Sequence, residues 1–116
     1  MLKVKEITSY KIETLAGLSV PEAFGLAIMI AEGDEEAALA IADIACSWKC
    51  VYSGNGRMMT LSSDKEAGPA IQFVIGAEGK EVHIIVESIS YDNERVAIVS
   101  DTWPVEDLVD ILEVEI

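Results

Sequence analysis

The chain has 116 residues, close to the commonest length of a single domain, and 51% of them are hydrophobic. Its 21 acidic and 8 basic residues give a net charge of -13. The hydrophobic content excludes an intrinsically disordered chain, and the dense negative charge disfavours direct binding to nucleic acids or to anionic membranes. We therefore expect one folded domain, residues 1–116, that attracts basic proteins.

The first residues predict an edge or bulged strand. Residues 2–12 mix apolar residues and lysines with a partial period of two. They contain no apolar run of seven or more residues followed by a small-residue cleavage site, which a secretory signal requires. We expect a cytoplasmic protein.

A helical hairpin is predicted over residues 21–47. Pro21 and the acid after it mark the start of a helix that runs to about Glu32, Gly33 suits a left-handed helix end, and Asp34 opens a second helix to about Ser47. The apolar run of residues 23–31 is far shorter than the roughly 20 residues needed to cross a bilayer, so we do not expect a membrane hairpin.

The apolar surface of this hairpin has two explanations, burial in the core or contact with a second copy of the chain. The candidate residues of a homodimer contact are Phe24, Ile28 and Met29.

Strands are predicted after Trp48. Residues 49–53 and 58–63 form a hairpin around a tight turn at Asn55 and Gly56. Further strands are predicted over AIQFVIG (70–76), EVHIIVESIS (81–90) and RVAIVS (95–100). A short helix follows from about Pro104 to Leu112, and the alternating end LEVEI could instead form a terminal strand.

Together these elements predict an α+β fold. It consists of an N-terminal strand, a helical hairpin, an antiparallel meander sheet of four to five strands and a short C-terminal helix, with the helices packed on one sheet face.

Catalytic chemistry has little support in the sequence. His83 is the only histidine, and no nucleophile or orienting partner is predicted near it. Cys46 and Cys50 have a spacing that departs from the usual zinc hook, and no phosphate-binding motif occurs. We expect no metal, no cofactor and no enzymatic activity.

The acidic residues are more informative. Residues 12–48 contain seven acids and residues 96–116 contain six, and neither segment contains a base. The candidate partner-binding residues are Glu106, Asp107, Asp110 and Glu113, expected as a stripe on the last helix, and Asp34, Glu35 and Glu36. The first set is preferred, because acids at the start of a helix are explained by capping, whereas acids near its negative end are not.

These features favour a non-catalytic acidic protein that docks electrostatically onto a basic partner such as a toxin nuclease. In size, acidity and lack of a catalytic set, the chain resembles the small bacterial immunity proteins that neutralise such toxins, a likeness of overall character rather than of a residue motif. The alternative is a homodimeric acidic chaperone of the kind found in bacterial secretion systems. A third hypothesis is a small-ligand module or an enzyme of unknown type.

Overall fold

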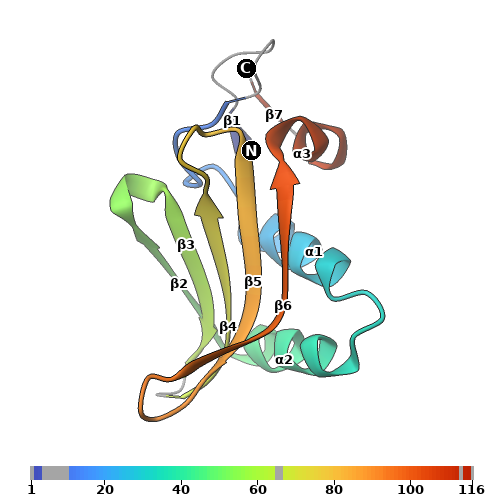
Figure 1. Ribbon diagram of the computed structural model, residues 1–116, viewed down its shortest axis with the longest axis vertical. Coiled ribbons are helices and arrows are strands. Elements are labelled where there is room, and N and C mark those ends of the chain that lie inside the picture. The colour runs from blue at the N-terminus through green and yellow to red at the C-terminus, as the bar shows by residue number, and fades with distance from the viewer. Residues whose placement is uncertain (1, 4–10, 65–66, 113, 116) are drawn as a thin grey trace.

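The computed structural model of the protein describes residues 2–3, 11–64, 67–112 and 114–115. Its centre is a five-stranded antiparallel sheet in which each strand pairs with the next one along the chain (Figure 1). The strands are β2 (Trp48–Ser53), β3 (Met58–Ser63), β4 (Gly68–Ile75), β5 (Glu81–Ile89) and β6 (Arg95–Pro104). The predicted α+β fold with a meander sheet is confirmed.

Two helices, α1 (Val20–Ile30) and α2 (Glu35–Cys46), pack on the same face of this sheet (Figure 1). On that face the strands present alternate apolar residues such as Leu61, Phe73 and Ile84, all fully buried. The opposite face is half-exposed, because no described helix covers it. The period of two in each central strand therefore separates a core face from an open face.

Local capping determines where both helices begin. The Ser19 hydroxyl accepts a hydrogen bond from the Glu22 amide at 3.2 Å, and the Glu22 carboxylate accepts one from the Ser19 amide at 3.1 Å. This capping box starts α1, and Pro21 lies in its first turn. Gly33 has a φ of 82°, the left-handed conformation that its position predicts.

The turns between strands also follow the sequence. Asn55 and Gly56 have φ values of 57° and 86°, so the predicted tight turn is confirmed, as a short 3-10 segment, η1 (Gly54–Gly56). Asn93 has a φ of 60° in the turn between β5 and β6. Asparagine and glycine occupy these positions because they adopt positive φ at the least steric cost.

The two chain ends form a second, smaller sheet. Of the strand predicted over residues 2–12, the described residues contain β1 (Leu2–Lys3) and an isolated bridge at Lys11, and residues 4–10 lie outside the described residues. β1 pairs in parallel with β7 (Val114–Glu115) in a separate two-stranded sheet rather than with the meander. The predicted last helix is α3 (Val105–Ile111), so the chain end contains both the helix and the terminal strand.

β6 is four residues longer than predicted, because the strand continues through the polar residues Asp101 and Thr102 to Pro104. Its pairing with β5 contains one bulge, opposite Val86 and Glu87.

None of the helices in the described part of the chain has the length and apolar character needed to span a membrane.

Candidate functional site

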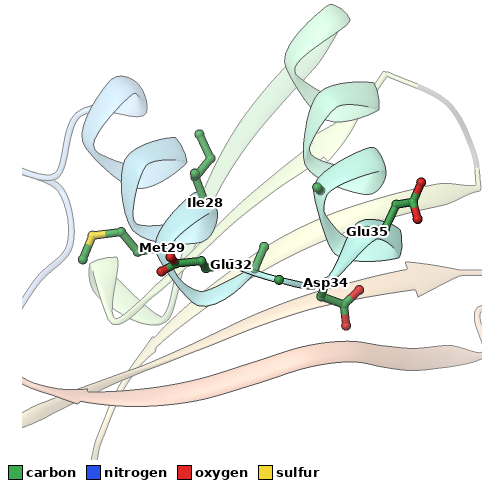
Figure 2. Close-up of a pocket in the computed structure, with 8 residues that line it drawn as sticks. Ile28, Met29, Glu32, Asp34 and Glu35 are labelled. Atoms are coloured by element: carbon green, nitrogen blue, oxygen red, sulfur yellow. The ribbon is translucent and has the colours of Figure 1, made fainter.

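A hollow of about 640 Å³ lies where α1 turns into α2 (Figure 2). Four of its lining residues are apolar, three are acidic and one is the turn glycine. These residues, which we call the hairpin hollow, are Ile28, Met29, Ala31, Glu32, Gly33, Asp34, Glu35 and Ala38. None of them is basic, and the chain contains no base between Lys11 and Lys49.

The apolar part of the hollow follows from how α1 packs. The helix buries Ala23, Leu26 and Ala27 against the core, which is one stripe of spacing three and four. Ile28 and Met29 lie beside that stripe, and their side chains are 60% and 41% exposed. Two large apolar residues therefore face solvent next to the turn.

The acidic part comes from the turn and the start of α2. The Asp34 carboxylate accepts a hydrogen bond from the Ala37 amide at 2.9 Å and caps α2. Glu32 and Glu35 are exposed, and no ion pair within the described residues neutralises either of them. Figure 2 shows these three carboxylates along the turn that follows Ile28 and Met29.

The hollow combines two groups of residues that the sequence suggested separately. Ile28 and Met29 were candidates for a dimer contact, and Asp34 and Glu35 were candidates for partner binding. Of the other candidates, Phe24 packs half-buried against the core and Glu36 is exposed outside the lining. Sequence reasoning missed Glu32, although it ends the same apolar run.

The acidic stripe predicted on the last helix is described only in part. Glu106 and Asp107 are exposed in the first turn of α3, but this helix ends at Ile111 and Leu112 is extended. Glu113 and the side chain of Asp110 lie outside the described residues.

The two acidic segments are also far apart. Figure 1 shows α3 at one end of the long axis of the molecule and α2 towards the other. A single small contact therefore does not include both sets of predicted residues.

The structure gives His83 two polar neighbours that the sequence did not indicate. Thr102 lies directly opposite His83 in the β5–β6 pairing, and its hydroxyl is 2.7 Å from His83 Nδ1. Glu81 Oε1 is 3.6 Å from His83 Nε2. The sequence did not reveal this hydroxyl, because the predicted strand ended at Ser100.

Glu81, His83 and Thr102 place a carboxylate, an imidazole and a hydroxyl next to one another. This cluster nevertheless lacks two features of a nucleophilic site. The Thr102 amide, which could have stabilised an oxyanion, donates instead to Asp101 Oδ1 at 2.8 Å. The side chains of His83 and Glu81 are 43% and 50% exposed on the open sheet face, so water surrounds them. The geometry supports a cross-strand polar pair.

Cys46 and Cys50 are free thiols, the first exposed and the second half-buried. Among the described residues, no three or more histidine, cysteine or acidic side chains are arranged to hold a metal ion.

Comparison of the chain with protein-family models, with curated proteins and with solved structures gave no match. The assignment of a function therefore depends on the surface chemistry of the hairpin hollow.

Proposed function

We propose that this protein is a non-catalytic binding protein that docks the hairpin hollow onto a basic protein. The observation that supports this proposal is the exposure of Ile28 and Met29 beside three carboxylates in a region that contains no base. An apolar centre with a charged rim is the usual composition of a protein interface. The centre contributes affinity, and the rim contributes orientation and association rate.

The charge of the protein indicates the class of partner. A net charge of -13 on a small domain produces a negative potential that accelerates association with cationic surfaces at low salt. Nucleases carry cationic surfaces for phosphate binding, and carboxylates spaced along a turn can occupy the same surfaces. We therefore propose a basic toxin nuclease as the partner and inhibition as the activity, as in immunity proteins.

Two pairs of variants test this proposal. Ile28→Ser removes a 60% exposed side chain from the hollow, and Leu39→Ser removes a 66% exposed side chain of α2 outside it. Glu32→Lys with Glu35→Lys reverses two charges in the hollow, and the control Glu106→Lys with Asp107→Lys makes the same net change on α3. Each control matches its test variant in chemistry and exposure but differs in location.

The probes are purified basic ribonucleases and deoxyribonucleases. We expect inhibition of one of these proteins that weakens with salt, and a loss of affinity of roughly tenfold or more for each hollow variant. The two controls should bind within about twofold of the wild type. Equal weakening by the α3 variant would place the contact elsewhere, and binding without inhibition would refute the inhibitor role.

A further inference from the structure

The outer edge of β2 is a second surface, separate from the hairpin hollow. β2 is the first strand of the sheet, and Figure 1 shows no described helix or strand beyond it on that side. An edge strand presents backbone amides and carbonyls that have no partner within the sheet, and proteins usually protect such edges with charges, prolines or bulges. β2 has one charged residue, Lys49, no proline, and a continuous register with β3.

The pairing with β3 determines which residues of β2 present these free groups. The Asp64 amide donates to the Ser47 carbonyl at 2.9 Å, and hydrogen-bonded positions alternate with non-bonded ones along an antiparallel pair. Lys49 and Val51 therefore direct their backbone groups towards β3. The amides and carbonyls of Trp48, Cys50 and Tyr52 point away from the sheet.

The side chains of the same strand are unusually apolar for an exposed edge. Three of the nine large apolar side chains that are exposed among the described residues belong to these six residues. They are Trp48, Val51 and Tyr52, which are 47%, 56% and 42% exposed. Trp48 and Tyr52 lie on the same strand face as Cys50, and Val51 lies on the other.

The stretch of sequence that contains this edge has the opposite sign of charge to the chain as a whole. Residues 44–63 contain no acid and two bases, Lys49 and Arg57, in a chain whose net charge is -13. A basic partner of the kind proposed for the hairpin hollow is not attracted here. A second copy of this chain can approach because this edge brings no carboxylate against another carboxylate.

We propose that β2 pairs antiparallel with β2 of a second copy about a two-fold axis at Cys50, which joins the two sheets into one. In this register the backbone of Trp48 forms hydrogen bonds with the backbone of Tyr52 of the second copy, and Cys50 forms them with Cys50 of the second copy. All three residues whose backbone groups point away from the sheet then have a partner. Each tryptophan then contacts a tyrosine across the strands, and aromatic cross-strand pairs are stabilising. On the other sheet face, Val51 lies beside Lys49 of the second copy.

Two-fold symmetry is what makes a second copy fit this edge. An isologous interface requires a surface that is complementary to itself, and β2 satisfies this requirement because its aromatic residues lie at equal distances on either side of Cys50. The inference does not depend on the proposed function, since it uses different residues on a different part of the molecule.

The two natural cysteines give the first test. In the proposed register the two Cys50 residues are directly opposite, with α-carbons about 5.5 Å apart. A short bismaleimide should therefore cross-link the reduced wild-type protein and Cys46→Ser into covalent dimers, but not Cys50→Ser. Cross-linking that requires Cys46 instead would overturn the proposal.

Two substitutions at Val51 test the register. Val51→Lys places a lysine beside Lys49 of the second copy, whereas Val51→Glu places a carboxylate there. We expect Val51→Lys to weaken the dimer roughly tenfold, through two symmetry-related like-charge pairs, and Val51→Glu to dimerise at least as well as the wild type. Equal weakening by both would contradict the pairing about Cys50.

The control is Val96→Lys on β6, the other edge of the sheet, where Val96 is 58% exposed. Sedimentation from micromolar to millimolar protein should show the same dimerisation for this variant as for the wild type, and circular dichroism should verify that all variants are folded. A wild-type protein that stays monomeric over this range, or a dimer lost only in Val96→Lys, would refute the β2 contact.

Discussion

The substitution Asp34→Ala tests the structural role of this residue at the start of α2. The Asp34 carboxylate caps α2 by accepting the Ala37 amide at 2.9 Å, and it lies at the positive end of the helix dipole. Loss of an N-cap costs about 1 kcal/mol, and loss of the charge costs a few tenths to 1 kcal/mol more. We therefore expect a destabilisation of about 1–2 kcal/mol, or about 4–8 °C in melting temperature for a domain of this size.

Two controls divide this loss into its parts. Asparagine caps a helix about as well as aspartate, so Asp34→Asn should lose only the charge contribution, at most about 1 kcal/mol. Glu35→Gln removes a charge from the same turn without removing a cap. Urea denaturation followed by circular dichroism measures all three variants. If Asp34→Asn is as unstable as Asp34→Ala, or if Asp34→Ala has wild-type stability, the capping explanation is wrong.

Three further predictions concern stability and can be measured by urea denaturation. Gly79→Ala should destabilise the fold by at least about 2 kcal/mol, because Gly79 has a φ of 74° and an added Cβ would lie 2.6 Å from the Ile12 carbonyl oxygen; wild-type stability would contradict this. Arg95→Ala should cost about 1–2 kcal/mol and more than Glu87→Gln, because it leaves the buried Glu87 carboxylate without the guanidinium now 2.9 Å away. Burial raises the pKa of Tyr52, so ionisation favours the unfolded chain and stability should fall as the pH rises above about 10, less steeply in Tyr52→Phe. If stability falls as steeply with rising pH in Tyr52→Phe as in the wild type, this pH dependence does not come from Tyr52.

Local signals made much of the fold predictable. The capping box at Ser19, the cap at Asp34 and the left-handed residues Gly33 and Asn55 each depend on neighbours within about four positions. Such interactions are encoded in short stretches of sequence, so the helix starts and the tight turn were predicted close to where they occur.

The candidate site was predicted only in part. The sequence indicated that Ile28 and Met29 could be a contact surface and that Asp34 and Glu35 were acidic candidates, but not that these residues line one hollow. That outcome depends on which stripe of α1 faces the sheet, and an almost uniformly apolar helix does not reveal its buried side. The acidic stripe of the last helix stays a prediction, because Glu113 and the side chain of Asp110 lie outside the described residues.

The order of helices and strands, the turns and the excess of negative charge could be read from the amino-acid sequence, because they depend on composition and on near neighbours. The three-dimensional arrangement was needed to show that Thr102 lies opposite His83, that β1 pairs with β7, and that the apolar edge of β2 has no partner in the sheet. Each of these depends on pairing between distant segments, which is selected by the packing of the whole core rather than by local preference.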